Sequence, residues 1–127
     1  MTLPQNFISD LRAIVGDKNV IDGGSGLDRN SRDAFWYSPI LKPQLEHKKA
    51  DVIVQPQTLE QLVQVVAKTV QARVPITPRG AGTGNYGQSV PIHGGVLIST
   101  RLMRNIIELT PDYAHVEAGV ILHTIET

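Results

Sequence analysis

The first half of the chain contains one clear helical pattern and then a long stretch without periodicity. Between residues 5 and 15, apolar side chains recur at the spacing of one helix face, which predicts a short amphipathic helix that Gly16 ends. These side chains are Phe7, Ile8, Leu11, Ile14 and Val15. Residues 16–50 carry glycine, proline and scattered charge instead. We therefore expect a long irregular arm, which the aromatic cluster at residues 35–37 (Phe35, Trp36 and Tyr37) anchors to the rest of the protein.

Strand and helix patterns alternate from residue 51 onward. Residues 52–54 form an apolar run typical of a buried strand, and residues 74–77 form a second strand pattern. Between them, Thr58 and Gln61 have the spacing of a helix capping box. A helix from residue 59 to about residue 71 should follow and bury one apolar stripe. This stripe consists of Leu59, Leu62, Val63, Val66 and Val70. Strand, helix and strand in this order predict a right-handed βαβ unit with parallel strands.

A glycine-rich loop separates this unit from three further strand patterns. Residues 96–99 predict a third strand of the same layer, and residues 106–109 and 114–117 predict a pair that turns at Pro111 and Asp112. Residues 121–127 begin like a helix. The fold class we expect is α/β to α+β: a small three-stranded parallel βαβ layer followed by the start of a second, mainly antiparallel sheet.

Composition and charge exclude several classes of function. The chain has 127 residues, with 12 Lys and Arg against 12 Asp and Glu, so nothing in its net charge points to nucleic acid. It contains no cysteine, which excludes disulfides and thiolate chemistry and fits a reducing compartment. No apolar run approaches the ~18 residues of a membrane span, and no secretory signal pattern is present at the N-terminus. We expect a cytoplasmic protein. The four histidines are scattered, so no metal site is expected.

The glycine-rich loop is the strongest chemical signal in the sequence. The run from Gly80 to Thr100 contains no Lys, Arg, Asp or Glu. Glycines at alternate positions 80, 82 and 84 allow positive φ and a close approach of the backbone to a ligand. Successive N–H groups in such a turn bind anions, and Thr83 adds a hydroxyl donor. The pattern predicts a pyrophosphate site that uses few or no cationic side chains.

Two phosphate-binding motifs match this loop only in part. Residues 82–87 have the spacing G-x-G-x-x-G, but Pro91 and further glycines follow where a dinucleotide-binding fold needs a helix. Residues 82–89 also approach a P-loop, with Gln88 at the position of the required lysine. A purely structural turn cluster that joins two strands is the remaining alternative.

Residues 78–84, 88–91 and 94–96 (Pro-Arg-Gly-Ala-Gly-Thr-Gly, Gln-Ser-Val-Pro and Gly-Gly-Val) resemble the pyrophosphate loop of a known family. The family is that of the FAD-linked oxidases with the vanillyl-alcohol-oxidase (PCMH) type of FAD-binding domain, in its glycolate oxidase and D-lactate dehydrogenase branch. The resemblance is close over residues 50–120 and looser over the rest of the chain. It implies FAD as the cofactor and, for an intact relative, oxidation of a 2-hydroxy acid by hydride transfer to the flavin.

The resemblance also implies which residues contact FAD. The backbone amides of residues 80–84 would face the diphosphate, residues 88–90 would line the cofactor, and Gly119 would bring a second stretch of backbone close to the flavin. Pro78 and Arg79 would end the strand that delivers the loop, with Arg79 either structural or a ligand. The cofactor-binding candidates are Pro78, Arg79, Gly80, Ala81, Gly82, Thr83, Gly84, Gln88, Ser89, Val90 and Gly119. Some relatives carry a flavin-linked histidine where Thr83 stands, so the resemblance implies non-covalent FAD at this loop.

The length of the chain departs from the family pattern. Members usually add a second half of the FAD-binding domain and a substrate domain that supplies most catalytic residues. We therefore divide the chain into the N-terminal helix and arm, residues 1–50, and a partial FAD-binding domain, residues 51–127, and we expect no turnover from it alone. An alternative is a non-catalytic half-domain that binds a nucleotide or associates with itself. Exposed sheet edges make a homodimer the simplest such assembly.

Overall fold

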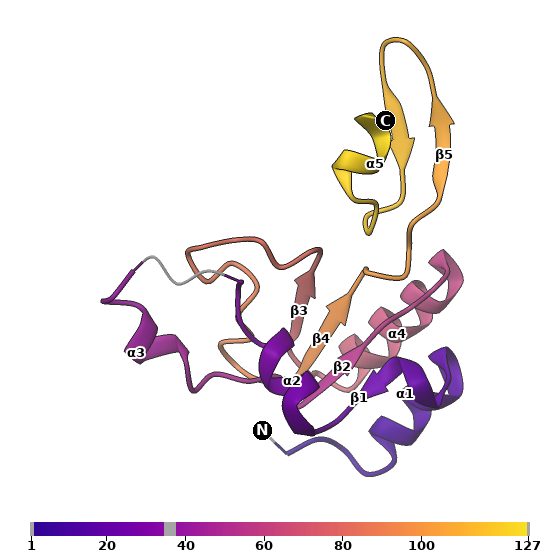
Figure 1. Cartoon of the computed structure of the whole chain (residues 1–127). Coiled ribbons are helices and arrows are strands. Elements are labelled where there is room, and N and C mark those ends of the chain that lie inside the picture. The colour runs from indigo at the N-terminus through magenta and orange to yellow at the C-terminus, as the bar shows by residue number, and fades with distance from the viewer. Residues whose placement is uncertain (1, 35–37, 127) are drawn as a thin grey trace.

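The chain folds around a four-stranded mixed sheet with the strand order β1-β2-β4-β3 (Figure 1). Strands β2 and β3 both run parallel to β4, while β1 runs antiparallel to β2. The strands are β1 (Val20–Ile21), β2 (Val52–Val54), β3 (Ile76–Arg79) and β4 (Val96–Ser99). This computed structural model describes residues 2–34 and 38–126. The aromatic anchor predicted at residues 35–37 lies outside the described residues.

The predicted βαβ unit is confirmed, but its two strands are not neighbours. Helix α4 (Leu59–Gln71) connects β2 to β3, and β4 lies between these strands in the sheet. Val96 of β4 is in register with Val52 of β2 on one side and with Ile76 of β3 on the other. Because the three strands are parallel, their carboxyl ends lie at one edge of the sheet. The glycine-rich loop leaves β3 at this edge.

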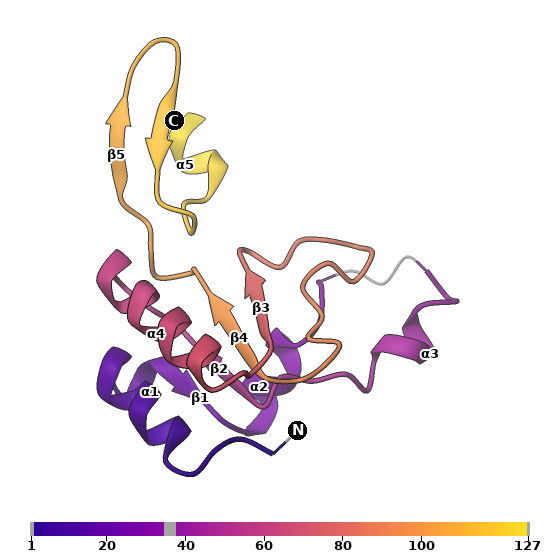
Figure 2. The ribbon, with the colours of Figure 1, turned by 180° about the vertical axis from the view of Figure 1, so that it is seen from behind.

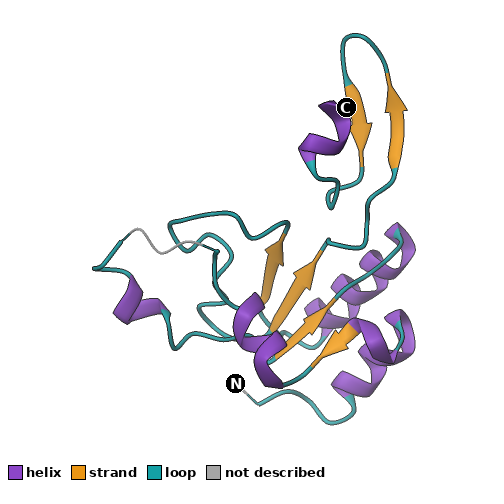
Figure 3. Ribbon diagram, viewed as in Figure 1, coloured by secondary structure: helices purple, strands orange, loops and turns teal. Residues whose placement is uncertain are grey.

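Apolar side chains of the central strands are buried on both faces of the sheet. Val52, Val54, Val96 and Ile98 pack with α1 (Phe7–Val15) and α4 in the larger core cluster. On the opposite face, Ile53 and Leu97 pack with Ala50 and near Leu27 of α2 (Gly24–Asn30). Figures 2 and 3 show this arrangement of helices around the sheet. Burial on both faces explains why β2 and β4 have continuous apolar runs rather than alternating patterns.

Residues 16–50 are more regular than the sequence predicts. They contain a 3-10 helix η1 (Asp17–Asn19), strand β1, helix α2 and helix α3 (Lys42–Leu45), so the expectation of a wholly irregular arm is wrong. Strand β1 has two residues, too few for a period-two pattern, and is defined by its pairing of Val20 with Val54. Helix α2 begins Gly-Ser-Gly, a poor helix-forming sequence, and no side chain caps it. Tertiary packing, not local propensity, specifies both elements.

Helix α4 has the predicted bounds and the predicted N-cap. The Thr58 hydroxyl accepts a hydrogen bond from the Gln61 N–H at 3.2 Å. The Gln61 side chain accepts one in return at 2.8 Å, from the N–H of Gln57 rather than from that of Thr58. The Thr58 side chain thus satisfies one of the N–H groups that have no partner within the first turn of α4.

Among the helices of the described residues, none combines the length and apolar character that a membrane crossing requires.

The buried face of α4 differs from the predicted stripe. Val65 and Thr69 are buried, whereas Leu59, Val63 and Val70 are 62%, 57% and 61% exposed. The sequence pattern treated Thr69 as polar and placed it outside the stripe. In the structure its hydroxyl donates to the Val65 carbonyl at 2.7 Å, and this bond allows the side chain to be buried. The predicted stripe is therefore wrong at three of its five positions.

A second, two-stranded antiparallel sheet follows β4, as predicted. It consists of β5 (Ile106–Leu109) and β6 (Ala114–Val116), with an irregular register between Ile106 and Glu108, and is followed by helix α5 (Leu122–Glu126). Both views show this hairpin projecting beyond the carboxyl edge of the main sheet (Figures 1 and 2). Every residue of β5 is exposed. The hairpin contributes no residue to either core cluster.

The corrected face of α4 predicts opposite outcomes for two valines of the same helix. Val65→Ala should lower the free energy of unfolding by about 2 kcal/mol, because it removes fully buried methyl groups. Val63→Ala should change it by less than about 0.5 kcal/mol, because Val63 is exposed. Urea denaturation followed by circular dichroism measures both. A larger loss from Val63→Ala than from Val65→Ala would contradict the observed packing.

Candidate functional site

The loop between β3 and β4 has an unusual backbone at Gly82. Its φ is 69°, and a Cβ at this position would overlap the guanidinium group of Arg79. Gly80 and Gly84 do not have positive φ, so the expectation of left-handed backbone at alternate glycines holds only for Gly82. Further along, Gly87 has a φ of 85°. The positive φ therefore favours glycine at position 82, and a larger residue would also have to displace the Arg79 guanidinium.

A buried carboxylate from the N-terminal segment fixes the second part of the loop. Asp33 is 3% exposed. Its carboxylate oxygens accept hydrogen bonds from the N–H groups of Gly87 at 2.7 Å and Ser89 at 3.3 Å. The N–H of Ala34 donates to the carbonyl of Gly82 at 2.8 Å. Sequence reasoning missed Asp33, because 54 residues separate it from Gly87 and no local pattern links the two.

Arg79 attaches the same segment to the end of β3. Its Nη1 donates to the carbonyls of Arg32 at 2.7 Å and Asn30 at 3.2 Å. Burial lowers the pKa of Arg79, and the nearby charge of Asp33 opposes this shift. These contacts hold residues 30–32 against the start of the loop, as expected if Arg79 has the structural one of its two candidate roles.

The first part of the loop leaves its amide groups free. In the described residues, no hydrogen bond uses the N–H groups of residues 80–85. Most of the next N–H groups are occupied: that of Tyr86 donates to the Gln88 side chain at 3.0 Å and that of Val90 to the Gly87 carbonyl at 3.2 Å. Gln88, Ser89 and buried Val90 thus serve the internal structure of the loop. The free amides coincide with the stretch predicted to face a diphosphate.

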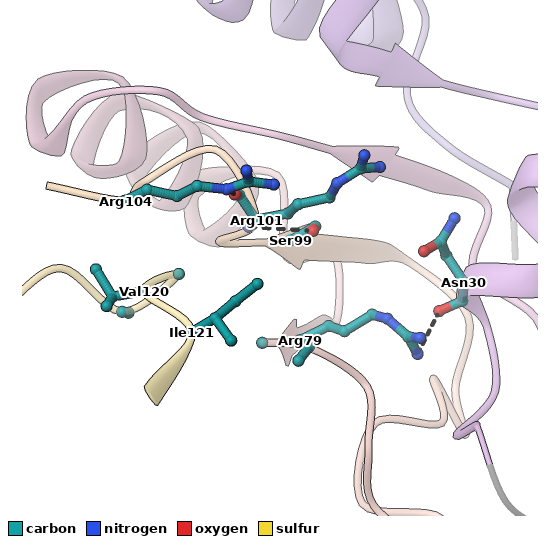
Figure 4. A pocket seen from close by; sticks show the side chains of 11 residues that line it. Asn30, Arg79, Ser99, Arg101, Arg104, Val120 and Ile121 are labelled. Carbon is teal, nitrogen blue, oxygen red and sulfur yellow. Dashed lines mark hydrogen bonds between the residues drawn. The ribbon is translucent and has the colours of Figure 1, made fainter. Parts of the chain in front are cut away.

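A cavity of about 240 Å³ brings two of the predicted stretches together. Gly80 and Ala81 lie on its wall with Gly119, while Thr83, Gly84 and residues 88–90 do not. The N–H of Gly119 donates to the Met103 carbonyl at 2.9 Å, and a Cβ there would overlap the Thr100 carbonyl. Figure 4 shows the cavity. It is lined by Asn30, Arg79, Gly80, Ala81, Ser99, Arg101, Arg104, Ala118, Gly119, Val120 and Ile121.

The cavity is cationic, contrary to the prediction from the uncharged loop. Arg79, Arg101 and Arg104 line it, and its lining residues include no Asp or Glu. Arg101 and Arg104 lie in the turn after β4, where the Met103 N–H donates to the Thr100 carbonyl at 2.9 Å. The signal that could have found them is their position directly after the uncharged run.

The chain belongs to a family of FAD-binding domains. The family model described as "FAD binding domain" matches residues 50–127, which is more than half of the chain. The fold and the unbonded amides of the loop agree with this membership. FAD is therefore the cofactor of this domain, as the resemblance implied.

Named relatives place the domain among FAD-linked oxidoreductases. An uncharacterised FAD-linked oxidoreductase of Mycobacterium tuberculosis is 30% identical over 115 residues, which cover 89% of this chain and 24% of that protein. Glycolate oxidase subunit GlcD of Bacillus subtilis is 28% identical over 103 residues, 80% of this chain and 22% of that protein. D-lactate dehydrogenase of Anaerostipes hadrus is 32% identical over 79 residues, 61% of this chain and 17% of that protein. The chain is thus related to the glycolate oxidase and D-lactate dehydrogenase branch.

Solved structures share the fold. p-Cresol methylhydroxylase with substrate bound superposes with a TM-score of 0.75 at 23% identity, over 93% of this chain and 23% of that one. This likeness confirms the expected fold class, with a parallel βαβ layer and a second antiparallel sheet in the PCMH-type arrangement. The chain spans about a quarter of the length of the curated relatives it matches.

Removing the buried carboxylate should loosen the loop. Asp33→Ala leaves the N–H groups of Gly87 and Ser89 without their acceptor, at a cost of about 1–3 kcal/mol. We expect both amides to exchange with deuterium faster, as measured by NMR. Asp28→Ala is the matched control, because it removes an exposed carboxylate that pairs with Lys49. Unchanged exchange at Gly87 in the Asp33 variant would show that the loop keeps its shape without this carboxylate.

Proposed function

We propose that residues 80–84 bind the diphosphate of FAD through their backbone amides, without a covalent bond to the cofactor. The observation that carries this proposal is the run of free N–H groups at residues 80–85, at the carboxyl end of a parallel strand. Ligands bind outside the carboxyl ends of strands in open α/β sheets. Amides that are already fixed in place bind an anion without further ordering. Pro78 and Arg79 deliver the loop, and Asp33, Gln88 and Ser89 hold its shape.

The cavity fits part of FAD. Its volume of about 240 Å³ is below the roughly 300–1,000 Å³ of sites that enclose a whole drug-sized ligand. The cationic and amide groups on its wall suit the diphosphate, while Gly119 and Val120 bring backbone close enough to meet the adjoining part of the cofactor. When bound, FAD supplies the hydride acceptor, and the protein supplies binding and orientation.

We further propose that the full oxidoreductase oxidises a 2-hydroxy acid. Two of the named relatives support this substrate class: glycolate oxidase subunit GlcD and D-lactate dehydrogenase. The described residues contribute the proposed cofactor site to this reaction.

A methyl group at Gly80 tests the proposed diphosphate contact without disturbing the protein. A Cβ at Gly80 meets no protein atom within 4 Å, and its φ is not positive, so Gly80→Ala should fold normally. If the diphosphate lies against this backbone, we expect at least about a tenfold loss of FAD affinity, or ~1.4 kcal/mol, in a fluorescence titration. Gly23→Ala, at another glycine with open space around it, should leave affinity unchanged. Equal affinities for the parent and the Gly80 variant would contradict the assignment.

Self-association through the hairpin is a second role that the exposed apolar surface favours. Ile107, Leu109 and Leu122 are 58%, 59% and 72% exposed, and such patches drive association. We expect a concentration-dependent dimer in sedimentation velocity, which Ile107→Glu should weaken. Ile40→Glu, at an exposed position outside the hairpin, should have no effect. A monomer at every concentration would exclude this role.

A further inference from the structure

We propose that Arg101 and Arg104 bind the diphosphate of FAD, so that guanidinium groups as well as backbone amides hold the cofactor. This inference rests on the proposed function of the loop and extends it to the turn after β4. The diphosphate site then combines neutral backbone N–H groups with cationic side chains.

The first argument is the unbalanced charge on the cavity wall. Within the described residues, the Arg101 guanidinium has no ion-pair or hydrogen-bond partner, and Arg104 uses only its Nε, which donates to the Arg101 carbonyl at 2.6 Å. Lys49 and Lys68, by contrast, each pair with a carboxylate, that of Asp28 and that of Asp10, both at 2.7 Å. Since no carboxylate lines the cavity, the Arg101 and Arg104 guanidinium groups keep an unbalanced positive charge there, which favours an anion.

Arg79 does not share this role. Its Nη1 is bonded to backbone carbonyls, and Figure 4 shows the guanidinium beside Asn30, away from Val120 and Ile121. Its charge also lies near that of Asp33. The two arginines after β4 therefore carry the cavity's uncompensated charge.

The second argument identifies the anion as a diphosphate. Gly80 and Ala81 line the same cavity as Arg101 and Arg104, so residues with unbonded amides and residues with guanidinium groups surround one space. A diphosphate offers oxygens to both sets of donors at once, and guanidinium groups bind phosphate oxygens in pairs. Val120 and Ile121 complete the wall with apolar side chains, and neither competes with the anion for these donors. A carboxylate of a hydroxy acid has too few oxygens to engage all of these groups.

The test compares FAD binding by the parent chain and by Arg101→Gln/Arg104→Gln at low and high sodium chloride. We expect the double variant to lose about tenfold or more in affinity at low salt and to show a shallower dependence on salt, because fewer exposed charges remain to be screened. Arg73→Gln, at an exposed arginine between α4 and β3, should match the parent. Thermal melting of all three proteins checks that the arginines act on binding rather than on folding.

Competition experiments distinguish a site for a diphosphate from a site for the carboxylate of a hydroxy acid. Inorganic pyrophosphate should displace FAD from the parent and do so less effectively from the double variant, whereas lactate should not compete. Arginine-dependent competition by lactate alone would overturn the inference in favour of a carboxylate site. If FAD binds both proteins equally at every salt concentration, the inference fails and the loop assignment stands. If the parent chain does not bind FAD at all, the loop assignment and the inference both fail, and a direct NMR titration with pyrophosphate then shows whether the cavity binds a free diphosphate instead.

Discussion

The hydrogen bonds of Asp33 to the loop are the constraint on which the site depends. Residues 80–95 contain six glycines and no regular secondary structure, so ordering them costs more conformational entropy than ordering most segments of this length. Asp33 and Arg79 offset this cost by fastening the loop to residues 30–34. All of these bonds lie outside the run of free amides. The second part of the loop is thereby held internally, and the first part remains available for a ligand.

The sheet places this loop beside the cationic turn. Strands β3 and β4 are parallel and in register, so the loop after Arg79 and the turn after Ser99 start from the same edge. Gly119 then brings the chain that follows the hairpin against the Thr100 and Met103 carbonyls. One cavity thus combines residues from four separate parts of the sequence, because Asn30 also lines it. Neutral amides and arginine side chains meet there because of topology, although the loop itself has no charge.

Patterns that arise locally were predictable, and those that arise from packing were not. The apolar run at residues 52–54 and the Thr58 cap predict their elements because burial on both faces and a cap each leave a mark within a few residues. The two-residue strand β1 and the buried face around Thr69 leave no such mark. At the site, the resemblance led to the glycines, whereas Asp33 bonds to a loop far along the chain and Arg101 shares a cavity with Gly80 and Gly119. Contacts between distant segments produce no local pattern in a single sequence.

The position of β4 between β2 and β3 has a consequence for how the domain folds. Strand β2, helix α4 and strand β3 are close in sequence, but β2 and β3 do not pair with each other. The strand that lies between them in the sheet is β4, which follows the glycine-rich loop in the chain. During synthesis, the facing edges of β2 and β3 stay open until residues 96–99 emerge. Closing this gap requires contacts distant in sequence, which slows folding and leaves strand edges exposed to mispairing. The stretch of chain that builds the ligand site therefore also sets the moment at which the sheet can close.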